Sequence, residues 1–433
     1  MKIIILTTGS RGDVQPFIAL GKGLKYFGYD VKIATHDTFQ TMAQNYGLEF
    51  VAIAGDVQSM MASESGQKML KSKNPIQLIQ QYEQMVQPLA AQAMSDSWAA
   101  CQDCDAIIFT AMSIWGYDIA EALGIPCFFA SLIPQSANSD FAYPSVSPTL
   151  HLVRNLNQLS YPFLMEAFGL IFRNPLNEFR RSQLHLPPIP FGTIYRRINR
   201  TSTPILYGYS PVVIPKPVNW SDRLQVTGYW FLAQHKDWQP SAALQDFLAA
   251  GSPPIYIGFG SMSSENPIQF TQMIIESLKQ TGQRGILLTG WGGIVQTDLP
   301  DNIFLLDSAP HDWLFPKMAA IVHHGGAGTT AAALRAGVPS VVVPFFGDQP
   351  FWGDRVHQLG TSPAPIPKAK LTVERLVAAI TTAVADVNMR KQAKVIANEI
   401  QVEDGVKQAV AILHRFIVDY KTKQRVILNR YAR

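Results

Sequence analysis

The 433-residue sequence contains few cysteines and little net charge. Three cysteines are too few for a disulfide framework, so we expect a protein of a reducing compartment. Cys101 and Cys104 have CxxC spacing, but no second pair or suitably spaced histidine accompanies them, which argues against a zinc site. A net charge of +4, from 36 basic and 32 acidic residues, is too small to indicate a nucleic acid partner. A weakly basic surface still suits an anionic lipid or an anionic small-molecule substrate.

Long hydrophobic runs are also lacking. The opening run, Ile3–Leu6, is short, and no run approaches the roughly 18 apolar residues that span a bilayer. We therefore expect a soluble, cytoplasmic protein, or one peripheral on a membrane surface. The C-terminus is basic, which usually means a solvated tail, with weak attraction to an anionic membrane as the alternative.

What the sequence does contain is a strand, a glycine-rich loop, a helix and a second strand within Ile321–Gln349. Ala319–His323 and Val338–Val343 read as buried strands, and Thr329–Ala336 between them reads as a helix that ends at Gly337. This order predicts a right-handed parallel βαβ unit. Its glycines allow backbone N–H groups to approach an anion at the positive end of the helix, which favours a nucleotide phosphate over a plain tight turn.

The chain also opens with a βαβ pattern, so two α/β domains are predicted. Ile3–Leu6 and Val31–Thr35 read as strands, with a helix from about Pro16 to Phe27 between them. Helix Pro267–Gln280 and strand Gly285–Thr289 belong to a second series that begins after a proline-rich stretch. We predict two doubly wound, Rossmann-like domains facing across a cleft. The predicted division is 1–228 for the first domain, 229–240 for a linker, 241–405 for the second domain, and 406–433 for a terminal helix and basic tail that could pack back on the first domain.

One segment of the first domain departs from the α/β pattern. Phe141–Phe191 contains seven prolines and an apolar helical stretch, Phe163–Phe172. An insertion of this length is usually functional or mobile. It could be surface decoration, or it could form an apolar pocket or lid.

Ligands of doubly wound sheets bind beyond the carboxyl ends of the strands, and six loops of this sequence follow strands. In the second domain, a developing diphosphate charge could be stabilised by fixed donors and a helix dipole without a metal ion. The DxD sequence Asp103–Asp105 precedes a strand, so we interpret it as a surface turn. The residues that could contact the diphosphate are Ser261, His324, Gly326, Gly328 and Thr329.

A dinucleotide-dependent oxidoreductase is a rival interpretation. The run Gly258–Ser263 lacks the third glycine of GxGxxG, and the first loop lacks the GxG spelling. No acidic residue stands where one would hold a ribose. The sequence therefore disfavours NAD binding.

Asp13 is the notable carboxylate of the first domain. Pro favours the first helical position, so Pro16 predicts a helix cap at Gln15 and places Asp13 just outside, pointing into the cleft. The nearby helix terminus should favour its ionised form, which suits a general base. Helix capping is the alternative role.

With these residues in place, the chain resembles glycosyltransferase family 1, of the GT-B class, over nearly its whole length. It is most similar to the sterol glucosyltransferases and to the bacterial enzymes that glycosylate antibiotic aglycones. Gly9–Phe17, reading GSRGDVQPF, and His323–Thr330, reading HHGGAGTT, carry this resemblance, and Pro310–Pro316 adds to it. It implies inverting transfer of a sugar, glucose above all, from a UDP-sugar to an acceptor hydroxyl, with no cofactor and no metal.

The resemblance also implies roles for individual residues. Asp13 matches the proposed base, and the loop before it, Ser10, Arg11 and Gly12, joins the donor-binding set. Ala309 and His311 lie in the segment that holds uracil. Asp348 and Gln349 match the pair that binds the sugar hydroxyls, and the diphosphate ligands are those given above.

Two positions depart from the plant members of the family. Ser308 stands where those enzymes stack a tryptophan on uracil, and Ala332 stands where they bind ribose with glutamate. Both changes fit the sterol and antibiotic branch. Trp291 and Trp313 are candidates for the stacking role.

The sequence thus favours glucosylation of a hydrophobic hydroxyl compound such as a sterol, lipid, or polyketide or phenolic aglycone. The aromatic first domain suits such an acceptor. Two alternatives stay open: a nucleotide-sugar-binding protein without transfer activity, and a UDP-sugar epimerase, whose chemistry also uses two facing Rossmann-like domains.

Overall fold

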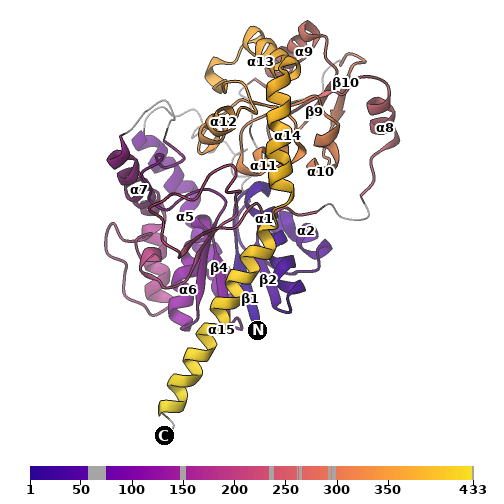
Figure 1. The fold of residues 1–433 in the computed structure, drawn as a ribbon. Coiled ribbons are helices and arrows are strands. Elements are labelled where there is room, and N and C mark those ends of the chain that lie inside the picture. Colours follow the sequence, from indigo (N-terminus) through magenta and orange to yellow (C-terminus); the bar gives the residue numbers. More distant parts are fainter. Residues whose placement is uncertain are drawn as a thin grey trace.

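In the computed structural model the chain forms two α/β lobes, each built on a parallel sheet (Figure 1). The structure describes residues 1–56, 75–146, 153–233, 238–260, 262, 266–290, 294 and 299–431. The first sheet has the strand order β3-β2-β1-β4-β5-β6-β7 and the second has the order β10-β9-β8-β11-β12. All the described strand pairs are parallel. The predicted fold class is confirmed.

The strands of the first sheet are β1 (Lys2–Leu6), β2 (Asp30–Thr35), β3 (Glu49–Ala52), β4 (Ala106–Phe109), β5 (Cys127–Ser131), β6 (Ile205–Tyr207) and β7 (Leu224–Val226). Those of the second are β8 (Ile255–Gly258), β9 (Gly285–Leu288), β10 (Ile303–Leu306), β11 (Ala320–His323) and β12 (Ser340–Val342). The apolar side chains of β1 and β4 are buried on both faces, which is why these strands read as continuous hydrophobic runs.

The helices of the first lobe are α1 (Arg11–Tyr26), α2 (Gln40–Asn45), α5 (Pro75–Ala100), α6 (Trp115–Leu123) and α7 (Arg154–Ser182). Those that follow are α8 (Ala242–Ala249), α9 (Pro267–Thr281), α10 (His311–Leu314), α11 (Ala327–Ala336), α12 (Gln349–Gln358), α13 (Val373–Ala385), α14 (Val387–Gln401) and α15 (Gly405–Tyr431).

Two helix starts differ from the sequence prediction, and both lie at the cleft. α1 begins at Arg11, five residues before the predicted Pro16, so the proline lies inside the helix. α11 begins at Ala327 with Gly326 as its N-cap, so Thr329 is in the first turn and is not the cap. In both cases glycine-rich sequence obscured the boundary, because glycine is a poor helix former in isolation.

The terminal helix α15 leaves the second lobe and crosses the first (Figure 1). Ala409, Leu413 and Ile417 are buried in a core shared with Phe17 of α1. His414 Nδ1 lies 2.8 Å from the Tyr29 hydroxyl and fixes the helix at its edge. The predicted linker contains no helix or strand among its described residues. The domain bounds themselves stay a prediction.

The proline-rich segment of the first lobe contributes to the core. α7 extends well beyond the predicted Phe163–Phe172, and it buries Tyr161, Phe172 and Phe179 against the lobe. Its end is fixed to α6, because Arg180 and Arg197 both contact Asp118, a fully buried carboxylate. The inner face of this helix is therefore not surface decoration.

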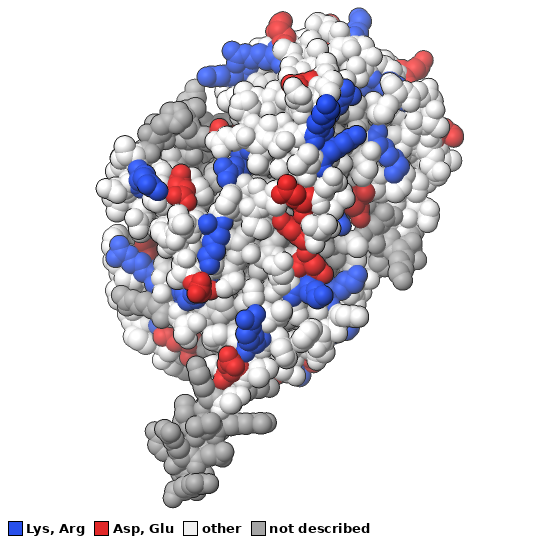
Figure 2. All heavy atoms as spheres, viewed as in Figure 1, with Lys and Arg blue, Asp and Glu red and all other residues white. Residues whose placement is uncertain are grey.

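The charges on the visible face of the molecule are mixed in sign. On the face shown in Figure 2, Lys and Arg side chains alternate with Asp and Glu. Among the described helices, none is long and apolar enough to cross a membrane.

Candidate active site

The N-termini of α1 and α11 face each other across the gap between the lobes. A Cβ atom added to Gly328 would lie 3.9 Å from the Cα of Gly12. Both helices therefore direct their unpaired N–H groups and positive dipole ends at the same space. At this distance a methyl group on Gly328 would touch Gly12 without a clash, so the packing of the two helices does not itself require glycine there.

Asp13 occupies the third position of α1 and caps the helix from inside. Its Oδ2 accepts hydrogen bonds from the Ser10 N–H at 2.8 Å and the Ser10 hydroxyl at 3.0 Å. Both of these hydrogen bonds fall on Oδ2, and both come from Ser10. One carboxylate oxygen is thus committed to capping, and the other is available to the cleft.

The acidity of Asp13 differs from the prediction. The helix dipole and the Ser10 hydrogen bonds favour the carboxylate, but desolvation by the surrounding protein is larger and raises its pKa. The expectation of a pKa lowered by the helix terminus is therefore wrong. A raised pKa makes Asp13 a stronger base when it is ionised.

Gly9 and His36 hold the loop in front of Asp13. The Gly9 N–H donates to His36 Nε2 at 3.2 Å, so the ring proton resides on Nδ1, which faces the Ile53 carbonyl at 3.4 Å. Gly9 has φ +133°, and a Cβ there would lie 2.5 Å from Asp13 Oδ2. Only glycine fits at this position. Burial lowers the pKa of His36, which keeps the ring neutral.

Asp348 stands on the opposite lobe as the N-cap of α12. Its Oδ2 accepts a hydrogen bond from Trp352 Nε1 at 2.8 Å. Burial raises the pKa of Asp348 to about 6, and the charge of Asp13 adds to the effect. The two carboxylates are therefore close enough to interact, and the structure brings together the predicted base and one predicted sugar ligand.

Gln349 is turned toward the protein. Its Oε1 accepts from the backbone N–H groups of Phe345 and Phe346, and its Nε2 contacts the Met262 sulfur at 3.3 Å. The side chain is 5% exposed. In this arrangement Gln349 shapes the loop that presents Asp348.

The glycine loop after β11 surrounds a neutral imidazole. Burial lowers the pKa of His324 to about 4, and its Nδ1 has no hydrogen-bond partner among the described residues. A Cβ at Gly326 would lie 2.4 Å from His324 Nε2. The ring is therefore packed directly against the N-cap of α11, where it can donate one N–H to an anion.

Arg11 of the first lobe and His311 of the second lobe lie close enough to interact across the gap. His311 stacks on Phe315, with ring centroids 4.2 Å apart. Burial lowers the pKa of His311 to about 3, and the charges of Arg11 and His324 contribute. The charge of Arg11, from the first lobe, therefore reaches the His311 ring on the second. Arg11 Nε donates to Gln15 at 2.8 Å. Ala309, just before α10, is buried.

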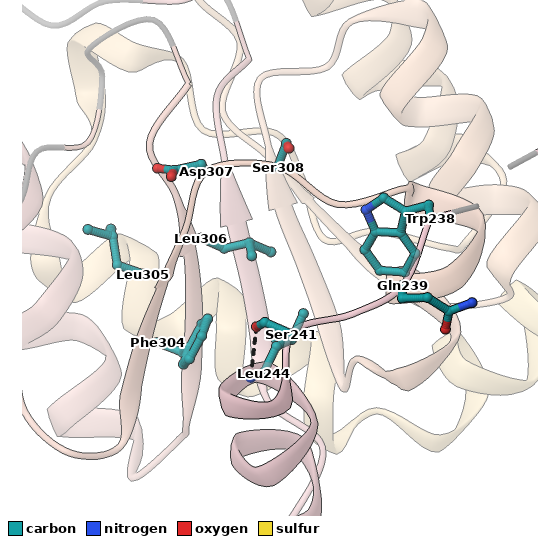
Figure 3. Close-up of a pocket in the computed structure, with 9 residues that line it drawn as sticks. All are labelled: Trp238, Gln239, Ser241, Leu244, Phe304, Leu305, Leu306, Asp307 and Ser308. Carbon is teal, nitrogen blue, oxygen red and sulfur yellow. Dashed lines mark hydrogen bonds between the residues drawn. The ribbon is translucent and has the colours of Figure 1, made fainter. Parts of the chain in front are cut away.

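The predicted base-binding region is only partly described. Ser261 and Trp291 lie outside the described residues. The rings of Trp313 and Trp238 pack together, with centroids 5.1 Å apart, and the Lys317 ammonium lies 4.1 Å from the Trp313 ring centroid. The Trp313 ring is therefore already in contact with other side chains of the protein. Ser308 lines a cavity of about 330 Å³ between β10 and α8, opposite Trp238 (Figure 3). Asp13, His324 and Asp348 do not line it.

Sequence reasoning missed three contributors to this site. His36 follows β2 directly, so the rule that ligand sites lie at strand ends could have found it. Trp352 lies one helical turn after Asp348, a spacing that allows side-chain contact. Tyr143, which accepts from Gln135 Nε2 at 3.1 Å and feels the charge of Asp348, left no signal in the sequence. Within the described residues, no group of three or more potential metal ligands occurs.

Two known protein-domain families match this chain, one in its first third and one in its last third. Residues 3–141 match the glycosyltransferase family 28 N-terminal domain. Residues 293–414 match the erythromycin biosynthesis protein CIII-like C-terminal domain.

Whole-chain relatives are sterol 3-beta-glucosyltransferases. One from Arabidopsis thaliana is 39% identical over 96% of this chain and 68% of its own length. One from Emericella nidulans is 36% identical over 96% of this chain and 30% of its own length. The chain thus spans about two thirds of the plant protein and under a third of the fungal one.

Among solved structures, the glycotransferase of kitacinnamycin superposes with a TM-score of 0.70, at 18% identity, covering 96% of this chain and 98% of that one. The glycosyltransferase VinC, solved in complex with DTDP, superposes with a TM-score of 0.63 at 20% identity, covering 96% and 99%. These likenesses show the GT-B fold.

Proposed function

The chain belongs to the glycosyltransferase family of the sterol 3-beta-glucosyltransferases, and from this premise we propose that it transfers glucose from UDP-glucose to the hydroxyl of a sterol or a similar hydrophobic alcohol. The observation that carries the proposal is the meeting of the α1 and α11 N-termini, with Asp13 on one side and His324 on the other. One side offers a base and the other offers donors for an anion.

The diphosphate of the donor would lie on the N-terminus of α11. The N–H groups of Gly326, Gly328 and Thr329 and the neutral ring of His324 would donate hydrogen bonds to it, and Arg11 would add positive charge from the first lobe. Ser261 completes the proposed set. Asp348 would accept hydrogen bonds from the sugar hydroxyls. Ala309 and His311 would border the base. These groups stabilise a departing diphosphate without a metal ion.

Asp13 would act as the general base. Its Oδ1 takes the proton of the acceptor hydroxyl while that oxygen attacks the anomeric carbon. The bond from the anomeric carbon to the phosphate oxygen breaks, and its electron pair leaves with UDP. Because nucleophile and leaving group lie on opposite sides of the sugar, one displacement inverts the anomeric centre. Ser10 keeps Asp13 in place through its N–H and its hydroxyl, and Gly12 belongs with Ser10 and Arg11 to the segment proposed to face the donor.

The acceptor would enter from the first lobe. Phe141 of that lobe meets Phe351 of α12, with ring centroids 5.4 Å apart, and Tyr143 lies nearby. An aromatic wall beside Asp348 suits a flat, apolar alcohol. Division into an acceptor domain at 1–228 and a donor domain at 241–405 belongs to this proposal, as does residence in the cytoplasm or peripherally on a membrane.

The experiment is to incubate the purified full chain with UDP-glucose and a panel of sterols, phenols and soluble sugars, and to identify the products by mass spectrometry. Transfer to a sterol or another hydrophobic alcohol supports the proposal. Transfer to soluble sugars alone would contradict the acceptor class. An epimerised UDP-sugar without acceptor would favour an epimerase, and donor binding without turnover would favour a binding protein.

A further inference from the structure

Helix α7 exposes large apolar side chains on the face that points away from the protein. Leu156 is 49% exposed, Leu159 60%, Phe163 74% and Leu170 40%. At 100° per residue, these four side chains lie within an arc of roughly 60° on the helix. We call them the α7 stripe. The opposite face is buried, so the helix is apolar on both sides (Figure 1 shows α7 at the outer edge of the first lobe).

The segment that contains the stripe is also strongly cationic. Residues 153–200 contain seven arginines and two acidic residues, although the whole chain carries a net charge of only +4. Arg180 and Arg197 are neutralised by buried Asp118. Arg154 and Arg181 stand at the two ends of α7 with side chains 77% and 73% exposed, and each also contacts one acidic side chain, Asp140 and Glu178 respectively.

Within the stripe itself, charge is nearly absent. Glu166 is the only Asp, Glu, Lys or Arg residue between 155 and 172. Its carboxylate turns inward and accepts the N–H groups of Ile194, Tyr195 and Arg196. Beyond the stripe, Phe191 is 73% exposed and lies under the guanidinium of Arg173, 5.8 Å from ring centroid to Cζ.

We propose that the α7 stripe docks on the surface of a bilayer that contains anionic lipid. The apolar side chains would enter the boundary between headgroups and acyl chains, and Arg154 and Arg181 would meet the headgroups. An apolar stripe with cationic ends complements an anionic lipid surface, whereas a soluble protein gains nothing from leaving such a stripe in water.

The inner face of the same helix borders the candidate site. The Tyr161 hydroxyl accepts from Asn138 Nδ2 at 2.6 Å, and its ring packs edge-on against Tyr143, with centroids 5.5 Å apart. The pKa of Tyr143 is raised by burial, and the charge of Asp348 adds to that effect. Docking through α7 would therefore place the acceptor wall one helix away from the lipid. Docking deepens the proposed peripheral residence by naming the surface that meets the lipid, and delivery of an acceptor from the bilayer rests on the proposed function.

The test is vesicle flotation of the full chain with phosphatidylcholine vesicles, with and without phosphatidylglycerol. The protein is expected to float with the anionic vesicles. The double substitution Leu159→Asp and Phe163→Asp should lower the vesicle partition coefficient at least about tenfold, because two apolar contacts are lost and two negative charges are added. The matched control is Val218→Asp with Val402→Asp, since these side chains are 92% and 85% exposed outside the stripe. This control should float like the unchanged protein.

Three results would overturn the proposal. The first is unchanged flotation of the stripe variant. The second is loss of flotation only when Lys421, Lys423 and Arg425 are changed to Glu. The third is a light-scattering result in which the unchanged protein is a dimer without vesicles and the stripe variant is a monomer. A second copy of the chain, and not a membrane, would then cover the stripe. Transfer to a detergent-dispersed sterol should be unaffected by the stripe substitutions. If transfer is absent while flotation follows the stripe, the proposed function fails and the docking surface stands.

Discussion

Asp13 and Asp348, on opposite lobes, approach closely enough for the charge of the first to raise the pKa of the second. Two carboxylates that lie close together repel each other. The repulsion is relieved when one of them is protonated or when both accept hydrogen bonds from a bound ligand. A sugar bound between a base and a hydroxyl ligand would use both carboxylates.

Donor binding should depend on pH through Asp348. With a folded-state pKa of about 6, Asp348 is mostly ionised at pH 7.5 and mostly protonated at pH 5. Because the carboxylate is the form that accepts hydrogen bonds from the sugar hydroxyls, UDP-glucose should bind more weakly at pH 5, by up to about tenfold. Calorimetric titration at both pH values measures this.

The matched control for that titration is Asp348→Asn, which has no titrating carboxylate at this position. Its affinity for UDP-glucose should change less between the same pH values. In Asp13→Asn, the midpoint of the pH effect on UDP-glucose should move lower, because the repelling charge is gone. An identical pH dependence for the unchanged protein and for Asp348→Asn would rule out Asp348 as the sugar ligand.

His36 should position Asp13 without touching substrate. His36→Phe removes the acceptor of the Gly9 N–H and frees the loop that packs on Asp13, so kcat should fall about tenfold with little change in the donor KM. Steady-state kinetics with Thr38→Ala, an exposed neighbour, as the control checks this. Gly9→Ala should be worse than His36→Phe, because its Cβ would collide with Asp13. Gly9→Ala kinetics like those of the unchanged chain would refute this packing.

Two glycines of the phosphate loop should respond differently to alanine. Gly326→Ala collides with His324, so the imidazole must move, and the donor KM should rise about tenfold or more. Gly328→Ala meets only Gly12, at 3.9 Å, so the folded protein should keep its melting temperature while donor binding is obstructed. The melting temperature of each variant, measured with and without UDP, separates a change in the folded protein from a loss of donor binding. Normal UDP stabilisation of both variants would place the diphosphate elsewhere.

The anchor of α7 should be a buried charge network. Asp118→Asn leaves Arg180 and Arg197 without their buried counter-charge, which should cost about 3–5 kcal/mol of unfolding free energy. Glu121→Gln is the control, because Glu121 contacts Arg180 at 2.7 Å but is 43% exposed, and it should cost less than about 1 kcal/mol. Urea denaturation measures both. Equal losses would mean that burial does not set the strength of these pairs.

The sequence predicted the parallel sheets and the loops at their carboxyl ends, because buried parallel strands are apolar on both faces and stand out as short runs. It misplaced the first turns of α1 and α11, where Gly12 and Gly328 read as loop although tertiary packing makes them helical. The direction of the Asp13 pKa could not be read from its neighbours in sequence, since the largest effect is desolvation in the folded protein. Trp352 contacts Asp348 from one helical turn away, a local spacing that the sequence does show, whereas Tyr143 joins the site through a contact that only the fold creates.

The central claim is that Asp13 removes a proton and does little to hold the donor. The direct test is Asp13→Asn, which keeps an acceptor oxygen for the Ser10 hydrogen bonds, with UDP-glucose affinity and sterol turnover measured in the same preparation. The account predicts affinity within about twofold of the unchanged protein at pH 7.5 and turnover at least about 100-fold lower. Equal losses of affinity and turnover, or full activity, would contradict it and leave Asp13 as a helix cap.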